Sequence, residues 1–344
     1  LELPLHGTIL TNVEVDHLDH YGSFEAIVGS FDTYLAQVPG PKVVCGDDEV
    51  SLRLARRHDT ITYGRGEGVD VRAVDVYPNR GAFSFDVLRD GRRLGAIQLP
   101  MRGIHNVINA TGAIAMALEL GVAFDDIASA LAKFGGVARR FDVRGIDHGA
   151  TFVDDYAHLP SEISAVLAAT RHSGEAWRRV VAVFQPNRYN RIAEIWAEYG
   201  TAFADADLVV LTDIYASGTT PIPGVTGKLI VNAVTQADPT KRVVWLPRRD
   251  ALIDVLAREA RPAPHVLALL LPERESGLEQ TELGDELPFF AQEISDHCAH
   301  RIRCIFSPNG LDPERSARRN LRQLPPVLYR KAEICRHGGS GRSV

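Results

Sequence analysis

The chain has 344 residues, of which 45% are hydrophobic and 24% charged, and its formal net charge is −6. This length allows two domains with separate cores, and the slightly acidic balance gives no electrostatic support for nucleic-acid binding. No apolar run approaches the ~20 residues of a membrane helix. Four cysteines in a chain of this size do not suggest a disulfide scaffold. We therefore expect a cytoplasmic protein with neither a membrane nor a nucleic-acid partner.

The first part of the chain, residues 1–136, combines helical spacing with strand-like alternation. Apolar side chains recur at helical spacing between Phe24 and Leu35. Further on, short segments alternate between apolar and polar side chains, and Asp90-Gly91 between two of them is a good turn dipeptide. In chain order we expect a strand at 7–15, a helix at 24–35, a strand at 42–45, β-hairpins over 60–100 and a helix at 106–120 that Gly121 caps.

The second part, residues 137–272, alternates regularly between apolar strands and helices. Strands that are apolar throughout and alternate with helices are typical of a parallel, doubly wound sheet. We therefore predict an α/β protein whose second domain is Rossmann-like and begins after Gly135-Gly136. The predicted strands lie at 150–154, 179–184, 207–212 and 242–246, and the predicted helices at 160–171, 190–204, 224–236 and 248–260.

The last part, residues 273–344, differs in kind. Residues 273–296 hold eight acidic side chains and one Arg, whereas residues 301–344 hold ten basic and three acidic ones. Pro325-Pro326 and the Gly-rich end at 338–341 are typical of linkers. We predict a disordered tail with little structure of its own after about residue 272.

Two adjacent carboxylates, Asp154 and Asp155, follow a short apolar run, and His158 comes three residues later. In open α/β sheets, ligands bind at the carboxyl ends of strands, so these side chains are placed where chemistry is usually done. A purely structural interpretation is that Ser161 with Glu162 starts a helix behind Pro160, and that one Asp caps it. That interpretation explains one carboxylate but not the pair together with His158.

An acidic and His-rich segment, residues 11–21, directly follows the first predicted strand. Carboxylates and neutral imidazoles are ligands for divalent cations, which a phosphate-handling enzyme needs to neutralise charge. The alternative is that Asp16 or Asp19 caps the next helix while the other polar side chains are solvated. These two interpretations are equally consistent with the segment alone.

Amide and guanidinium side chains occur at three further places. Asn106 and Asn109 lie three residues apart near the start of a predicted helix, where they are suited to a purine edge, although Asn106 as an N-cap is the alternative. Arg140 lies at the predicted domain junction, where it suits a phosphate or forms a surface ion pair. Arg188 and Arg191 follow a predicted strand and are suited to a carboxylate or phosphate, because basic side chains at a helix start otherwise oppose its dipole.

Two common nucleotide motifs are absent from the sequence. It contains no G-x-x-x-x-G-K-[ST] phosphate loop, and no G-x-G-x-x-G follows a predicted strand. A dinucleotide-dependent dehydrogenase is therefore not indicated.

In order and spacing, several of these segments resemble the Mur ligase family. The resemblance implies a partial central, ATPase-type Mur ligase domain at residues 1–136 and a Rossmann-like ligase domain at 137–272. Within the family, the segments look most like the ligases that join L-alanine to UDP-N-acetylmuramate in peptidoglycan synthesis. The matching segments are Thr11–Tyr21, His105–Asn109, Arg139–Asp142, Val153–His158, Gln185–Tyr189 and Asp213–Ala216.

The resemblance implies an ATP-dependent amide ligase that uses a magnesium ion. In such a ligase the muramate carboxylate becomes an acyl phosphate, which the amine of L-alanine attacks. On the matching positions, the resemblance implies that Arg140, Asp155 and His158 are catalytic and that His17 binds magnesium. It implies that Asn106 and Asn109 bind the adenine of ATP, and that Arg140 and Asp155 bind the nucleotide and its metal. His158, Arg188 and Arg191 would then bind the amino acid and the muramate carboxylate.

The chain also departs from the family pattern. It lacks the amino-terminal UDP-sugar domain and the phosphate loop, which precede this segment in the family, so we expect a truncated chain that is inactive alone. Leu159 and Asn187 stand where His is usual, and Thr219 stands where an acid is usual. Two alternatives remain open: a ligase that attaches recycled murein peptide to UDP-N-acetylmuramate, and a non-catalytic module that binds a nucleotide or an amino acid.

Overall fold

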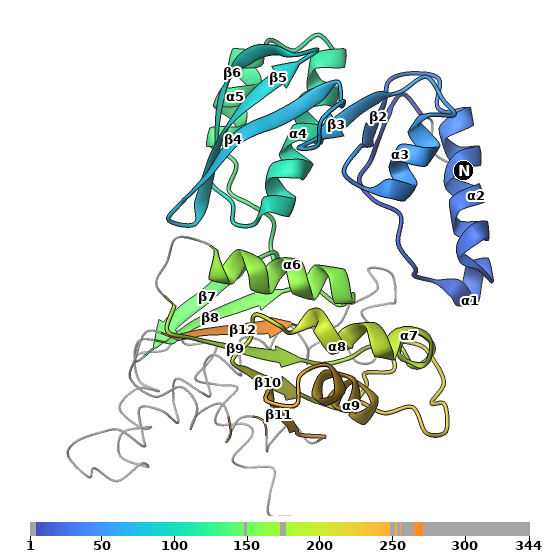
Figure 1. Cartoon of the computed structure of the whole chain (residues 1–344), viewed down its shortest axis with the longest axis vertical. Coiled ribbons are helices and arrows are strands. Elements are labelled where there is room, and N and C mark those ends of the chain that lie inside the picture. Colours follow the sequence, from blue (N-terminus) through green and yellow to red (C-terminus); the bar gives the residue numbers. More distant parts are fainter. Residues whose placement is uncertain are drawn as a thin grey trace, which may run out of the picture.

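The computed structural model describes residues 5–147, 150–172, 177–247, 252, 255 and 265–270. Within them the chain forms two six-stranded sheets, one built from each half of the described sequence, with helices packed against both (Figure 1). The α/β fold class predicted from the sequence is confirmed. The predicted boundary at Gly135-Gly136 lies in the connection between the two sheets, and the exact domain limits stay a prediction.

The first sheet and its helices comprise β1 (Thr8–Leu10), α1 (Leu18–Tyr21), α2 (Phe24–Gln37), β2 (Lys42–Cys45), α3 (Glu49–Ala55), β3 (Ile61–Gly64), β4 (Val71–Asn79), β5 (Ala82–Arg89), β6 (Arg92–Leu99), α4 (Ile104–Glu119) and α5 (Phe124–Ala132). The strands follow one another in the sheet in chain order. The neighbours from β1 to β4 are parallel, and β4, β5 and β6 form an antiparallel meander. Asp90 and Gly91, both at positive φ, make the predicted turn between β5 and β6.

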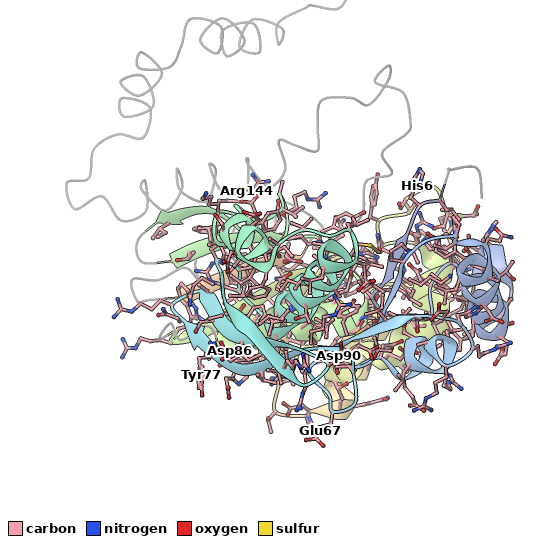
Figure 2. The ribbon with its side chains drawn as sticks, turned by 90° about the horizontal axis from the view of Figure 1, so that it is seen from above. His6, Glu67, Tyr77, Asp86, Asp90 and Arg144 are labelled. Atoms are coloured by element: carbon pink, nitrogen blue, oxygen red, sulfur yellow. The ribbon has the colours of Figure 1, made fainter. Side chains whose placement is uncertain are left out.

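The core of this part lies between the meander and α4. Phe83, Phe85 and Val87 alternate along β5 and are buried in one cluster with Val107 and Ile114 of α4. This burial at every second residue follows from strand geometry and matches the alternation in the sequence. Figure 2 looks onto the molecule from above, with side chains of the meander at its periphery.

The second sheet and its helices comprise β7 (Asp142–Asp147), β8 (Ala150–Asp155), α6 (Pro160–Arg171), β9 (Arg179–Phe184), α7 (Tyr189–Ile195), the 3₁₀ helix η1 (Trp196–Glu198), α8 (Tyr199–Ala202), β10 (Leu208–Leu211), α9 (Lys228–Ala237), β11 (Arg242–Trp245) and β12 (His265–Leu270). The strand order is β11-β10-β9-β12-β8-β7. All neighbours are parallel except β7, which runs antiparallel to β8. The predicted parallel sheet is therefore confirmed, with one antiparallel edge strand added.

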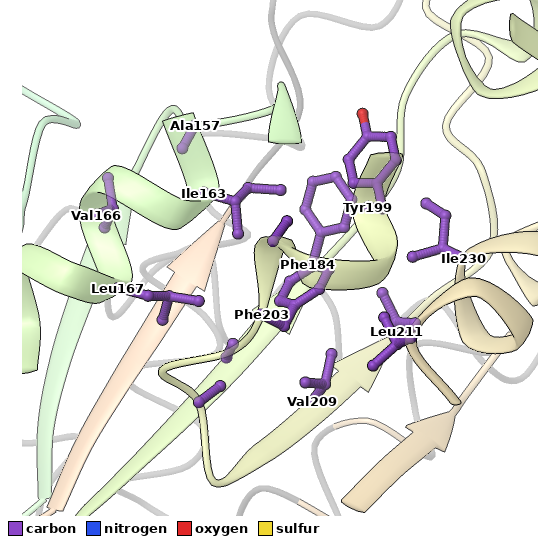
Figure 3. Packing of buried hydrophobic residues seen from close by; sticks show 14 of the residues in the cluster. Ala157, Ile163, Val166, Leu167, Phe184, Tyr199, Phe203, Val209, Leu211 and Ile230 are labelled. Carbon is purple, nitrogen blue, oxygen red and sulfur yellow. The ribbon is translucent and has the colours of Figure 1, made fainter. Parts of the chain in front are cut away.

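Helices α6, α7, α8 and α9 bury apolar side chains in one cluster with those of the second sheet. Figure 3 shows part of this packing from close by. The largest fully buried side chains in the packing are Phe184, Tyr199 and Phe203. The ring centroid of Phe184 lies 5.6 Å from that of Tyr199 and 5.8 Å from that of Phe203. This packing fixes the end of β9, after which the chain turns toward the first domain.

Several predicted elements differ from the observed ones. The strand predicted at 7–15 is confined to β1, and the helix predicted at 190–204 is divided into α7, η1 and α8. Helix α9 begins at Lys228 instead of 224, because Gly224 has a φ of 83° that no helical residue adopts. Helices α1, α3 and α5 and strand β7 were not predicted, and the hairpins predicted over 60–100 are wrong for β3, which pairs in parallel with β2 and β4. Most of the helix predicted at 248–260 and the whole predicted tail at 273–344 lie outside the described residues.

No helix in the described part of the chain is long and apolar enough to cross a membrane.

Candidate functional site

The two carboxylates at the carboxyl end of β8 are buried and already engaged. Asp155 is 2% exposed, and its two oxygens accept hydrogen bonds from the backbone N–H groups of Phe141 at 2.7 Å and Ala157 at 2.8 Å. Burial raises the pKa of Asp155, and the two N–H groups partly offset that effect. Asp154 accepts a hydrogen bond from Arg144 at 2.8 Å. Asp155 therefore ties the end of β8 to the domain junction and Asp154 ties it to β7, while Oδ1 of Asp154 has no partner among the described residues.

His158 lies in the turn from β8 to α6 and is 7% exposed. Its Nδ1 lies 3.0 Å from the carbonyl oxygen of Tyr156 and 3.2 Å from Oε2 of Glu162. Two oxygens at Nδ1 favour the tautomer with hydrogen there, which leaves Nε2 as a proton acceptor. Burial lowers the pKa of His158, so the ring is held neutral.

The carboxylate of Glu162, in the first turn of α6, caps the start of this helix. Its Oε2 accepts hydrogen bonds from the backbone N–H groups of His158 at 2.9 Å and Leu159 at 3.1 Å. Pro160 occupies the first helical position. A helix therefore starts where Ser161 and Glu162 predicted it, behind Pro160, but the expectation that an Asp caps it is wrong, because Glu162 supplies the capping carboxylate.

The guanidinium groups at the domain junction lie against one aromatic ring. The Cζ atoms of Arg139 and Arg140 are 5.0 Å and 5.2 Å from the ring centroid of Tyr156. Nη1 of Arg140 lies 3.6 Å from Oε1 of Glu162. Arg139 and Phe141 have φ values of 59° and 49°, in the left-handed region, and the bond from Phe141 to Asp155 holds this strained segment.

Arg188 and Arg191 follow β9 and are 8% and 4% exposed. Arg188 has a φ of 63°, and its backbone N–H donates to the carbonyl oxygen of Tyr215 at 2.9 Å. Nη1 of Arg191 donates to Oδ1 of Asn187 at 2.6 Å. These contacts fix both arginines at the carboxyl end of the parallel sheet, where such folds bind ligands.

Residues of the first domain lie directly against this arginine pair. Asp16 receives two hydrogen bonds at 3.0 Å from Nη2 of Arg191, one at each carboxylate oxygen. Nδ1 of His17 lies 3.4 Å from Nη1 of Arg188. The same segment and α7 line a small pocket that includes Asp19 and Glu194. The structure therefore brings His17, Arg188 and Arg191 together at one place between the two domains.

The two predicted adenine ligands lie on α4. This helix begins at Ile104, with Gly103 as the N-cap residue, so the alternative that Asn106 caps it is wrong. Nδ2 of Asn106 donates to the carbonyl oxygen of Arg102 at 2.7 Å, and Asn109 is exposed. The start of α4 lies near the domain junction, because Cζ of the preceding Arg102 is 4.7 Å from the ring centroid of Phe141.

The residues around His17 do not form a magnesium site in this arrangement. No three His, Cys, Asp or Glu side chains come together as metal ligands within the described ranges. His17 faces the guanidinium of Arg188, and the nearest carboxylate, Asp16, is bound to Arg191. A cation is repelled by these arginines, and Mg²⁺ prefers oxygen ligands. The assignment of magnesium to His17 stays a prediction.

Three contributing residues were not singled out from the sequence. Asp16 pairs with Arg191 across 175 residues of sequence. Asn187 orients Arg191, and Tyr199 donates a hydrogen bond from its hydroxyl to the carbonyl oxygen of His158 at 2.7 Å. The segments that contain Asp16 and Asn187 were recognised, but only the folded chain shows which partner each side chain has.

Comparison with known proteins places these two halves in one family. The model of the Mur ligase middle domain matches residues 2–117, and that of the Mur ligase, glutamate ligase domain matches residues 139–269. The chain belongs to the Mur ligase family. The resemblance inferred from the short sequence segments is thereby confirmed, and the two matched regions contain all the predicted site residues of this Mur ligase chain.

Curated Mur ligases of one type are similar to this chain. The UDP-N-acetylmuramate–L-alanine ligase of Acidothermus cellulolyticus is 42% identical over 276 residues, which cover 78% of this chain and 57% of that protein. The ligase of the same name from Pelobacter propionicus is 43% identical over 251 residues, which cover 71% of this chain and 54% of that protein. The chain thus spans somewhat more than half the length of these relatives.

Solved Mur ligase structures share the fold. The UDP-N-acetylmuramate-alanine ligase of Thermotoga maritima aligns with a TM-score of 0.63 at 24% identity, covering 85% of this chain and 59% of that chain. A murein peptide ligase from Psychrobacter arcticus aligns with a TM-score of 0.54 at 22% identity, covering 77% of this chain and 54% of that chain. At these identities the likeness concerns the fold alone.

Proposed function

We propose that this chain carries the catalytic cleft of an ATP-dependent amide ligase that joins L-alanine to UDP-N-acetylmuramate in peptidoglycan precursor synthesis. The observation that carries the proposal is the 42% identity, over 276 residues, to a ligase of that name. The site geometry supports it, because two buried arginines, a neutral imidazole and a junction arginine lie at the carboxyl end of β8 and β9.

The positive charges of Arg188 and Arg191 are complementary to the anionic groups of this reaction. Amide formation brings the carboxylate of the amino acid and an activated muramate carboxylate into one cleft, and both are anionic. Arg188 and Arg191 supply two permanent positive charges in a site with little water, where each interaction is stronger than in bulk solvent. We therefore assign to them the binding and orientation of the amino acid and the acyl group.

His158 suits the proton transfer that the amine requires. The ammonium group of L-alanine must lose a proton before its nitrogen can attack a carbonyl carbon. Burial holds the imidazole of His158 neutral, and the contacts at Nδ1 leave Nε2 to accept that proton. Glu162 beside the ring stabilises the imidazolium that forms.

The nucleotide is assigned to the domain junction. ATP supplies the phosphoryl group that activates the carboxylate. Asn106 and Asn109 are proposed to bind its adenine, and Arg140 its phosphates or ribose, because these residues lie near the junction. Both oxygens of Asp155 already accept hydrogen bonds from the backbone. A contact between Asp155 and the nucleotide therefore requires that one of these oxygens be shared.

Product analysis of the full chain tests the proposal. The protein is incubated with UDP-N-acetylmuramate, ATP and L-alanine, and UDP-N-acetylmuramoyl-alanine and ADP are measured by mass spectrometry. Parallel calorimetry measures the binding of each substrate. Arg188→Ala removes a proposed ligand, and Arg93→Ala, on the exposed face of β6, is the matched control.

Product that depends on Arg188 but not on Arg93 supports the proposal and refutes the expectation that this chain is inactive alone. Saturable binding of L-alanine without turnover, lost in Arg188→Ala, supports the assignment of the amino-acid site. Binding of none of the three substrates removes the proposal. Product with a murein tripeptide but not with L-alanine favours the recycling ligase instead.

A further inference from the structure

The carboxylate of Asp16 lies where a ligand of Arg191 is expected to bind. Nη2 of Arg191 donates to both oxygens of Asp16 at 3.0 Å, and Nε donates to Oδ1 at 3.1 Å. A planar guanidinium binds any carboxylate in the same side-on manner, whether it belongs to the protein or to a small molecule. Asp16 belongs to the first domain and Arg191 to the second, so this contact also links the two domains.

The pocket around Arg191 has the features of a built anion-binding site. Arg191 is 4% exposed, and its Nη1 is oriented by Oδ1 of Asn187. Asn187 is itself fully buried, and its Nδ2 has no hydrogen-bond partner among the described residues. Arg191 itself lines the small pocket between the two domains, together with Asp16 and His17, so an anion in that pocket can reach its guanidinium.

Asp16 is held in place by its own backbone as well. The backbone N–H of His17 donates to Oδ1 of Asp16 at 2.8 Å, and His17 adopts a left-handed conformation with a φ of 52°. The guanidinium of Arg191, which contacts both oxygens of Asp16, favours the ionised form of this carboxyl. The side chain is therefore an anion at neutral pH and competes with any other anion for Arg191.

We propose that Asp16 is an internal competitor that occupies the anion site of Arg191 and is displaced by the carboxylate of the incoming amino acid. The proposal rests on the proposed function only in naming an amino acid as the ligand. Displacement exchanges one carboxylate for another at the same guanidinium, with no covalent change. Because Asp16 lies on the segment between β1 and α1, its release also removes one of the contacts that hold this segment against the second domain, beside those of Glu14 with Ser161 and of His17 with Arg188.

Hydrogen exchange of residues 13–22, measured by mass spectrometry on the full chain, tests this displacement. Sodium acetate supplies a carboxylate, and sodium chloride at the same ionic strength controls for screening of the ion pair. L-alanine and L-alaninamide form a second matched pair, because the amide lacks the carboxylate. Asp16→Asn removes the internal charge, and Asp19→Asn removes a neighbouring exposed carboxylate that lines the same pocket.

We expect acetate to accelerate exchange in residues 13–22 more than chloride does, and L-alanine more than L-alaninamide. Without any ligand, Asp16→Asn accelerates exchange by about tenfold or more, which corresponds to a loss of ~1.4 kcal/mol of stabilisation of this segment. In this variant neither acetate nor L-alanine accelerates the exchange further. Asp19→Asn behaves like the parent chain.

Equal effects of acetate and chloride on the parent chain overturn the proposal, as does an Asp16→Asn chain that still responds to acetate. The first comparison uses the parent protein and needs no variant to fold. Acetate displaces Asp16 even if L-alanine is the wrong substrate. A failure of the proposed function, seen as absent product or absent substrate binding, is therefore distinguishable from a failure of the displacement.

Discussion

The carboxylate of Asp155, at the end of β8, accepts a hydrogen bond at 2.7 Å from the backbone N–H of Phe141, in the connection between the two domains. Phe141 has a φ of 49°, which costs free energy for an aromatic residue and persists only where other contacts hold it. The second oxygen of Asp155 holds Ala157 in the turn that leads to His158. One buried side chain thus positions both the junction arginines and the imidazole.

Asp155→Ala is expected to lower the free energy of unfolding by about 2 to 4 kcal/mol, because it leaves two buried N–H groups without an acceptor. Chemical denaturation followed by circular dichroism measures the change. Asp86→Ala is the control, since its carboxylate pairs with Arg93 at the surface, and we expect it to cost about 1 kcal/mol or less. Equal effects of the two substitutions would show that Asp155 does not hold the junction.

Much of this fold follows from local sequence patterns. The turn at Asp90-Gly91 forms where the dipeptide predicts it, and the helix expected from Phe24 occurs as α2. Strands β8, β9 and β10 of the second domain are buried almost throughout, as continuous apolar runs in a parallel sheet predict. Strand β7 was missed because Asp142–Asp147 has no strand-like pattern, and its pairing with β8 alone makes it a strand.

The candidate site was only partly predictable for a related reason. Arg188 and Arg191 stand out as basic residues near a helix start, which local rules disfavour. Asp16 and Asn187 are ordinary polar residues until the fold places them against Arg191. The break between α7 and α8 has no glycine or proline to mark it. Partnerships between distant segments are properties of the tertiary structure, and short sequence windows do not contain them.

Acidification is expected to destabilise the domain junction through its histidines. Burial is the main cause that lowers the pKa of both His105 and His158 below the ordinary value. A lowered folded-state pKa means that the neutral ring is favoured in the folded protein. This stabilisation is complete above about pH 6.5, the unfolded pKa, and is lost as pH falls toward the folded pKa.

Thermal melts between pH 7.5 and pH 5 measure this dependence. The melting temperature is expected to fall with pH, and His105→Gln is expected to reduce the slope because one buried ring no longer has to take up a proton. His20→Gln, at an exposed position of α1, should keep the parent slope. A parent-like slope for His105→Gln would contradict the prediction.

Tyr199 is expected to stabilise the turn at His158 through its hydroxyl. The group is fully buried, donates to the carbonyl oxygen of His158 at 2.7 Å, and its pKa is raised by burial. Tyr199→Phe keeps the ring packing against Phe184 but leaves that carbonyl without its donor, so we expect a loss of about 1 to 2 kcal/mol. Tyr77→Phe, at a side chain that is 62% exposed, is the control and should be neutral in the same denaturation experiment.

Two glycines in helices are expected to respond to alanine with opposite signs. A Cβ atom at Gly112 in α4 would lie 2.6 Å from Cζ of Tyr63, whose ring is fully buried. Gly112→Ala should therefore destabilise the first domain by about 1 to 3 kcal/mol, because the overpacking outweighs the gain in helix propensity.

Gly29 in α2 has no atom within 4 Å of the corresponding Cβ position and is exposed. Gly29→Ala should raise the free energy of unfolding by about 0.5 to 1 kcal/mol, because only the propensity term remains. Denaturant unfolding of both variants and of the parent chain measures the sign of each change in the free energy of unfolding. If both substitutions stabilise, Tyr63 can move, and α4 does not pack against β3 as closely as the structure indicates.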